Sequence, residues 1–160
     1  MQFTQSMSYP GTVDEVVAMY LTPDYLERRF GRFVVEGSTT VSVEGERVSY
    51  AGTVRPELIP AAATRFVKSD LRVTFTEEWT LNEAEATSRT SVTVDGAPVS
   101  VEATSTLTPS DAGSAREVSG NLSVRVPLLG GRIEKEAVAR VGRLTENEQA
   151  SAAQWLEEHR

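Results

Sequence analysis

The sequence contains no cysteine and a single histidine, His159, which lies next to the C-terminus. The absence of cysteine excludes disulfides, thiolate nucleophiles and cysteine-ligated zinc sites. With one histidine, neither a histidine-based metal site nor a Ser-His-Asp triad is expected. We therefore predict a protein that uses no cofactor and no metal, and we expect binding rather than catalysis.

Basic residues and long apolar runs are also scarce. The chain has 16 Lys and Arg against 23 Asp and Glu, a formal net charge of −7, which argues against a nucleic-acid partner because such a partner needs a basic surface. No apolar run approaches the roughly 18 residues of a membrane span. The first residues lack the basic and apolar regions of an export signal. We expect a cytoplasmic protein with no integral membrane association.

What the sequence does have is a change of period. Residues from about 32 to 126 alternate between apolar and polar, as strands do, whereas residues 131–159 repeat at steps of three and four, as an amphipathic helix does. The length of 160 residues is that of one domain, which we assign to residues 1–160. A long amphipathic helix must cover an apolar surface, and the sheet is the surface available.

Local signals divide the chain into elements. Thr12 and Glu15 have the spacing of a capping box, and Thr22 before Pro23 predicts a second helix start. Residues 56–69 are predicted to be a mobile connection containing a short helix or flap. The predicted strands are residues 2–8, 33–43, 47–55, 71–81, 86–94, 99–107 and 115–126.

Three stretches together resemble a known superfamily: residues 3–20, residues 66–79, and the sequence PLLGGRIE at residues 127–134. The chain resembles the START-like (SRPBCC) superfamily, which includes pollen-allergen-like and polyketide-cyclase-like proteins, and within it a bacterial family of uncharacterised proteins. The resemblance implies an α+β helix-grip fold, in which a curved antiparallel sheet in the order β-α-α-β6-α wraps around the C-terminal helix. It also implies a hydrophobic ligand between helix and sheet, and it transfers no functional residue.

The inward positions of the strands predict either a cavity or a filled core. Small side chains there would leave a partly polar space if the last helix does not fill it. Alternatively Leu144, Trp155 and residues 56–69 fill the gaps. The small inward residues are Gly52, Ala86, Ser88, Thr90, Ala103, Ser105 and Gly120. The predicted ligand walls are Tyr50, Phe75, Trp79, Val101, Leu122, Val141 and Leu144.

Glu77 is the weak catalytic candidate and also a candidate ligand contact, because it lies in the inward phase between Phe75 and Trp79. Burial raises the pKa of an unpaired carboxyl, which would suit a general acid or base. A bulge that turns Glu77 outward, a solvated strand end, or an arginine partner are the alternatives. The arginines considered as partners are Arg65, Arg89, Arg125 and Arg140.

Two further features have competing interpretations. Arg140, near the middle of the apolar stripe of the last helix, either meets an anionic head group or holds its charge in water, and Glu148 lies on the same stripe. Gly130 and Gly131 before this helix could bind phosphate, but without a nucleotide motif a turn that needs positive φ explains them better.

The sequence thus predicts a carrier or sensor that binds a hydrophobic or amphipathic small molecule, such as a lipid. One alternative is a cyclase or hydrolase that uses Glu77 in the same cavity. Another is a protein-interaction module with a filled core, which could form a homodimer.

Overall fold

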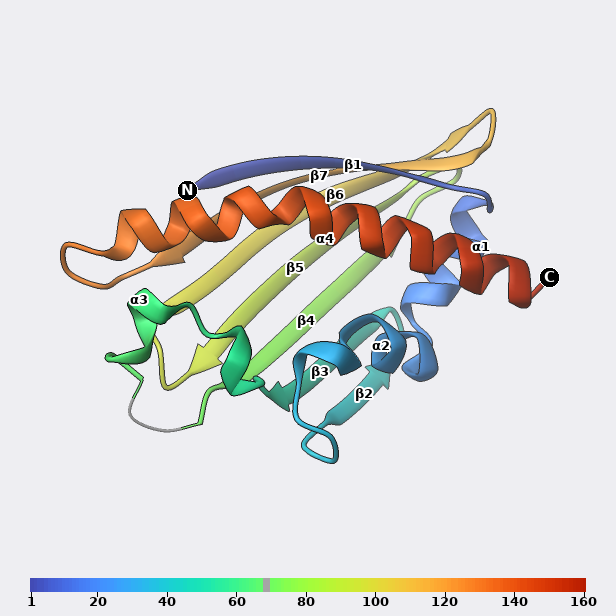
Figure 1. The fold of residues 1–160 in the computed structure, drawn as a ribbon. Coiled ribbons are helices and arrows are strands. Elements are labelled where there is room, and N and C mark those ends of the chain that lie inside the picture. Colours follow the sequence, from blue (N-terminus) through green and yellow to red (C-terminus); the bar gives the residue numbers. More distant parts are fainter. Residues whose placement is uncertain (68–69) are drawn as a thin grey trace.

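One antiparallel sheet organises the chain, in the strand order β1-β7-β6-β5-β4-β3-β2 (Figure 1). The computed structural model describes residues 1–67 and 70–160. Strands β2 to β7 form a meander, and β1 pairs with β7 at one edge. The strands are β1 (Gln2–Tyr9), β2 (Thr40–Glu44), β3 (Arg47–Thr53), β4 (Arg72–Leu81), β5 (Ala86–Asp95), β6 (Val99–Ser110) and β7 (Gly113–Val124).

The helices form the second layer, on the face of the sheet that we call the inner face. The predicted capping box is confirmed, since Thr12 Oγ1 accepts from the Glu15 N–H at 3.1 Å and Glu15 accepts from the Thr12 N–H at 3.0 Å. Thr22 precedes the next helix, but its hydroxyl donates to the carbonyl of Ala18 instead of capping. The helices are α1 (Val13–Tyr20), α2 (Pro23–Phe30), η1 (Gly31–Phe33), η2 (Pro56–Leu58), α3 (Ala61–Thr64) and α4 (Gly130–Glu158).

The predicted architecture of seven strands, two short helices and a long C-terminal helix is confirmed, but one prediction about a segment is wrong. The strand predicted from residue 33 begins only at Thr40, because the chain first forms η1 and then packs Val34 over Gly52. A Cβ at Gly52 would lie 2.8 Å from Val34 Cγ1. The short helix predicted within residues 56–69 is present, since this connection contains η2 and α3; residues 68 and 69 lie outside the described residues.

Helix α4 runs along the β1 and β7 edge of the sheet instead of over its centre (Figure 1). Its two ends are anchored: Ile133 is buried near the start, and Ala152 and Leu156 are buried near the end. Its middle is less covered, because Val141 is half-buried and Leu144 is 44% exposed. The alternative in which Leu144 helps to fill the space between helix and sheet is therefore not supported.

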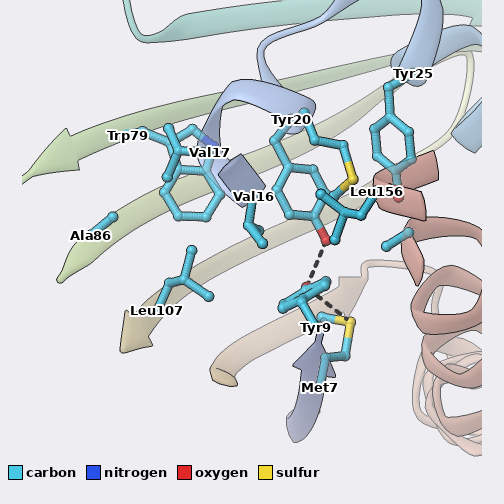
Figure 2. Close-up of a cluster of buried hydrophobic side chains, with 12 residues drawn as sticks. Met7, Tyr9, Val16, Val17, Tyr20, Tyr25, Trp79, Ala86, Leu107 and Leu156 are labelled. Carbon is cyan, nitrogen blue, oxygen red and sulfur yellow. Dashed lines mark hydrogen bonds between the residues drawn. The ribbon is translucent and has the colours of Figure 1, made fainter. Parts of the chain in front are cut away.

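The largest core cluster joins α1, the end of α4 and one end of the sheet (Figure 2). Tyr20 is fully buried at its centre, stacked on Trp79 at 5.7 Å and in edge contact with Tyr9 at 6.2 Å and Tyr25 at 5.6 Å between ring centroids. Aromatic pairs in such geometry add about 0.5–1.5 kcal/mol each beyond their burial. This end of the inner face is therefore filled by side chains of the protein itself.

The turn between β7 and α4 holds the one non-glycine residue with positive φ among the described residues, Leu128, with φ of 67°. Gly130 and Gly131 do not have positive φ, so that explanation of the glycine pair is wrong. Gly130 is needed for a different reason, because a Cβ there would lie 2.3 Å from the Val124 carbonyl oxygen.

We expect Leu128→Gly to stabilise the protein by about 0.5–1 kcal/mol. The left-handed conformation costs about 1–2 kcal/mol for a residue with a Cβ, and the fully exposed Leu128 side chain loses no burial when it is removed. Part of this gain is offset by the greater freedom of glycine in the unfolded chain. Urea denaturation of the two proteins measures the difference, and a destabilised variant would contradict the prediction.

Candidate functional site

Four of the predicted wall residues lie on one line across the inner face. Tyr50 pairs with Phe75, Phe75 with Val92, Val92 with Val101, and Val101 with Leu122. We call these five residues the apolar row. Tyr50 and Phe75 are buried, whereas Val92, Val101 and Leu122 are only half-buried. The row thus changes from filled at β3 to partly open at β5, β6 and β7.

The opening continues away from the aromatic cluster. Val73, Val94 and Val99, which lie beyond the apolar row toward the α3 end of the sheet, are also half-buried. Nearer the β1 and β7 edge, the middle of α4 contributes the half-buried Val141 and the exposed Leu144, whereas Arg140 is exposed to solvent. The inner face therefore has a closed aromatic end and a looser aliphatic end.

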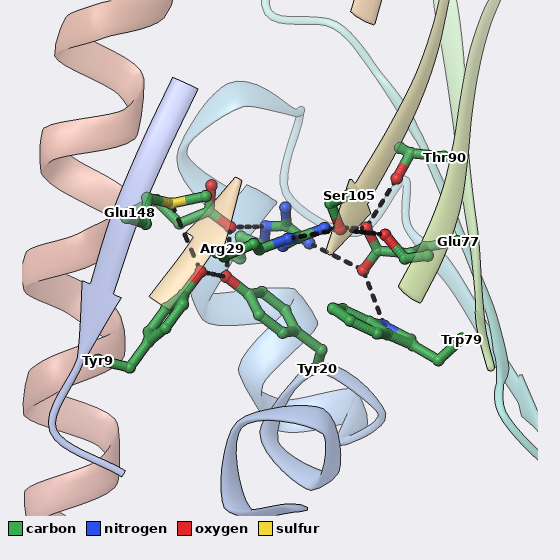
Figure 3. A network of polar contacts seen from close by, with 11 residues as sticks. Tyr9, Tyr20, Arg29, Glu77, Trp79, Thr90, Ser105 and Glu148 are labelled. Atoms are coloured by element: carbon green, nitrogen blue, oxygen red, sulfur yellow. Dashed lines mark hydrogen bonds and ion pairs between the residues drawn. The ribbon is translucent and has the colours of Figure 1, made fainter. Parts of the chain in front are cut away.

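Glu77 lies between these two ends, buried on the inner face with 1% exposure. Its carboxylate accepts hydrogen bonds from Thr90 Oγ1 at 2.8 Å, Arg116 Nη2 at 2.9 Å and Trp79 Nε1 at 3.1 Å (Figure 3). A second guanidinium, that of Arg29, comes within 3.9 Å. Neither the outward bulge nor the solvated strand end predicted as alternatives is present, and the two arginine partners are not among the four considered from the sequence.

The small residues of β5 and β6 make room for Arg116. Its guanidinium donates to Ser105 Oγ at 2.9 Å and to Ser88 Oγ at 3.2 Å on its way to Glu77. It also lies 4.9 Å from the ring centroid of Tyr20 and 4.8 Å from that of Trp79. Space that the sequence assigned to a ligand is thus occupied by a side chain of β7.

A neighbour also fills the space at Gly120. A Cβ at Gly120 would lie 2.5 Å from Phe3 Cζ, so the aromatic ring of β1 covers this glycine. Gly52 is covered by Val34 in the same way. Both glycines therefore accommodate neighbouring side chains and leave no vacant space.

A chain of polar contacts connects Glu77 to α4. Arg29 on α2 places its Nε 2.6 Å from Glu148 Oε1 on α4. Tyr20 donates to the same Glu148 oxygen at 3.2 Å, and its oxygen lies 2.7 Å from that of Tyr9. Two carboxylates and two guanidinium groups thus balance within one buried cluster, which holds α4 to the sheet through α2 (Figure 3).

The charge of Glu77 is stabilised by this cluster. Burial raises the pKa of Glu77, but the charges of Arg116 and Arg29, with the hydrogen bonds from Thr90 and Arg116, lower it by more, so the pKa lies below its ordinary value. Burial alone would have favoured the neutral acid. The arrangement is that of a structural ion pair and offers no proton for general acid catalysis near neutral pH.

A small pocket of about 170 Å³ lies between α2 and α4, beside this cluster. Its apolar lining includes Phe30, Phe33 and Leu144. Its charged lining includes Arg29 and Glu148. Phe30 also packs on Phe75 of the apolar row, with ring centroids 4.7 Å apart, so one aromatic side chain separates the pocket from the row.

The opposite, outer face of the sheet is polar and hollowed. The hollow has a volume of about 890 Å³, and its lining carries hydroxyl side chains of β4 to β7 together with the exposed ion pair of Arg47 and Glu78. Its lining is mostly polar and charged, with Phe3 and Ala103 as apolar members. Within the described ranges, the structure contains no helix long and apolar enough to cross a membrane and no cluster of acidic or histidine side chains that could hold a metal.

Arg116 and Arg29, the two residues whose charges stabilise ionised Glu77, were not among the residues predicted from the sequence. A signal for Arg116 was available, since it is in phase with Val118 and Gly120 on the same strand. A signal also existed for Arg29, because it lies four residues after Tyr25 and three after Leu26 and so shares the buried face of α2, whereas Arg28 lies off that face.

Comparison with known proteins places this geometry among uncharacterised relatives. Residues 4–156 match the family described as protein of unknown function (DUF2505). Uncharacterized protein Rv0481c of Mycobacterium tuberculosis is 28% identical over 166 residues, which cover 96% of this chain and 95% of the relative, and uncharacterized protein Mb0491c of Mycobacterium bovis matches equally.

Solved structures share the fold over the whole chain. TTHA0849 from Thermus thermophilus superposes with a TM-score of 0.65 at 16% identity, over 99% of both chains. Ara h 8.0201 superposes with a TM-score of 0.62 at 12% identity, over 99% of this chain and 98% of that one. At these identities the likeness shows a common helix-grip-like fold alone.

Proposed function

We propose that this chain, which belongs to the DUF2505 family, binds an apolar or amphipathic small molecule on the inner face of the sheet beneath the middle of α4. The partly open apolar row carries the proposal. Aliphatic side chains on three adjacent strands, Val92, Val101 and Leu122, stay half-buried below a helix that is anchored at both ends. Protein interiors are normally close-packed, so a guest that covers these side chains gains about 25 cal/mol per Å² of apolar surface removed from water.

The resemblance to the START-like superfamily supports the same function, because its members often hold such molecules between the long helix and the sheet. The buried cluster around Glu77 supports binding over an acid–base enzyme, since the carboxylate already accepts hydrogen bonds from Thr90, Arg116 and Trp79. The proposed role is therefore that of a carrier or sensor.

We expect the neutral probe 1-decanol to bind with a sub-millimolar Kd. Burial of about six methylenes at ~0.8 kcal/mol each supplies about 5 kcal/mol, which is sufficient for this affinity. In Val101→Trp the indole occupies the space of the guest, and we expect binding to weaken at least tenfold. Isothermal titration calorimetry measures both values.

Thr104→Trp is the matched control, because Thr104 lies on the same strand but is exposed on the outer face. It should bind 1-decanol as the original protein does. The proposal fails if 1-decanol does not bind the original protein, or if Val101→Trp and Thr104→Trp bind it equally well.

A further inference from the structure

Two residues that line the pocket between α2 and α4 carry buried donors that make no hydrogen bond in the described chain. The Tyr25 side chain is fully buried, and its hydroxyl has no hydrogen-bond partner among residues 1–67 and 70–160. Nη1 of Arg29 also makes no hydrogen bond there; its nearest acidic group is the Glu77 carboxylate, 3.9 Å away, which is too long for a hydrogen bond. Both residues line the 170 Å³ pocket. A buried donor without a partner costs about 1–3 kcal/mol, so two at one pocket call for an explanation.

Both groups remain donors at any working pH. Burial raises the pKa of the Tyr25 hydroxyl, and the charge of Glu148 raises it further, so the proton stays on the oxygen. For Arg29, burial lowers the pKa, but Glu148 and Glu77 raise it by more, so the guanidinium keeps its charge. The group that completes this pocket must therefore be a hydrogen-bond acceptor.

The charges at the pocket favour a negative acceptor. Arg28, Arg29 and Arg32 line it, against the single carboxylate of Glu148. Arg28 is bound by Glu158 at 2.8 Å and Arg29 by Glu148 at 2.6 Å. Arg32 is exposed at the pocket, where it packs over Phe33. Guanidinium groups bind carboxylates and phosphates through several N–H donors at once.

The volume of the pocket is large enough for the polar head group of a ligand but not for the whole ligand. A volume of about 170 Å³ corresponds to about five or six water molecules at ~30 Å³ each. An oxyanion with one or two neighbouring carbons fits this space, whereas a whole lipid-sized molecule does not. The contact between Phe30 and Phe75 brings the pocket next to the apolar row, where a hydrocarbon chain would lie.

We propose that the ligand carries an oxyanion head group, a carboxylate or a phosphate monoester, and that Tyr25 and Arg29 bind it in the α2–α4 pocket while its chain covers the apolar row. This inference rests on the proposed function, which supplies the site for the chain. It assigns the specificity of the protein to α2 and not to Arg140 or Glu77.

The test compares three probes with the same ten-carbon chain: decanoate, decyl phosphate and 1-decanol. We expect at least one of the two anions to bind at least tenfold more tightly than 1-decanol. Preference between decanoate and decyl phosphate then identifies the oxyanion. In Tyr25→Phe, which keeps the ring and removes only the unpaired hydroxyl, we expect the preferred anion to bind at least threefold more weakly and 1-decanol, a neutral acceptor, to lose less affinity than the anion.

Tyr25→Phe should fold normally, because the oxygen it removes has no hydrogen-bond partner in the described chain. Ser151→Leu provides a second variant that fills the pocket from α4, with Ala150→Leu as its control, since Ser151 lines the pocket and the exposed Ala150 does not. If all three probes bind equally and neither variant discriminates among them, the head-group inference is overturned while the proposed function stands. If none of the three binds, the proposed function fails as well.

Discussion

Replacing Glu77 with glutamine is expected to remove about 3–5 kcal/mol from the free energy of unfolding, and to lower the melting temperature by about 10 °C for a chain of this size. The substitution keeps the shape of the side chain but leaves two buried guanidinium groups with the single carboxylate of Glu148. An uncompensated charge in a buried site costs far more than an exposed pair contributes. Urea denaturation at pH 7 measures the loss.

The neighbouring residue supplies the control. Glu78 is adjacent in sequence but lies on the outer face, where its pair with Arg47 is 58–60% exposed. We expect Glu78→Gln to change stability by less than about 1 kcal/mol. The double variant Glu77→Gln with Arg116→Met leaves one guanidinium, that of Arg29, with one carboxylate, that of Glu148. Its loss in free energy of unfolding should therefore be smaller than the sum of the losses of the two single variants. Equal losses for Glu77→Gln and Glu78→Gln would contradict the structural role of the buried pair.

The same pair makes stability depend on pH. Because the folded-state pKa of Glu77 lies below its ordinary value of 4.5, the unfolded chain takes up this proton first as the pH falls. Its contribution is therefore fully present above that ordinary value and is lost as the pH falls through the folded-state pKa. Glu77→Gln should lose less stability between pH 5 and pH 3 than Glu78→Gln does.

Gly113→Ala is expected to cost about 3 kcal/mol or more. Gly113 begins β7 with φ of +144°, a conformation that residues with a Cβ rarely adopt. A Cβ there would also lie 2.3 Å from the Tyr9 carbonyl oxygen and 2.6 Å from the Gly11 nitrogen. Both atoms belong to the backbone, so relief requires the β6–β7 turn to move away from the end of β1.

Gly45→Ala is a control that separates the cost of a positive φ from the cost of steric overlap between the new Cβ and backbone atoms. Gly45 also has a positive φ, of +59°, but nothing lies within 4 Å of the position of its Cβ. This variant should lose only the conformational cost of about 1–2 kcal/mol. Denaturant unfolding of both variants compares the two losses, and a Gly113→Ala variant as stable as Gly45→Ala would show that the overlap is easily relieved.

The order of elements was predictable because each has a local cause. The capping box of Thr12 and Glu15 and the alternation of β4 are properties of neighbouring residues. The late start of β2 was not predictable, since it depends on Val34 packing against Gly52 across the fold. Alternation in the sequence predicts on which face of the sheet a side chain lies, but it does not predict which side chain from elsewhere in the chain packs over it.

The candidate site was predictable to the same extent. Tyr50, Phe75, Val101 and Leu122 were placed on one face by alternation, and the strand register then aligned them in one row. The positions of Ser88 and Ser105 were predicted to leave space for a ligand. Arg116 reaches both serines from β7, and residues adjacent in sequence to the serines give no indication of this contact.

The uneven anchoring of α4 has a consequence for exchange of a guest. Gly142 lies in its half-covered middle, where no other atom approaches the position of a Cβ within 4 Å, and a glycine weakens a helix interior by about 1 kcal/mol. Brief fraying of these turns needs less free energy than detaching either buried end. For a guest bound as proposed, we expect entry and exit at the middle of α4, where opening the helix leaves the aromatic cluster intact.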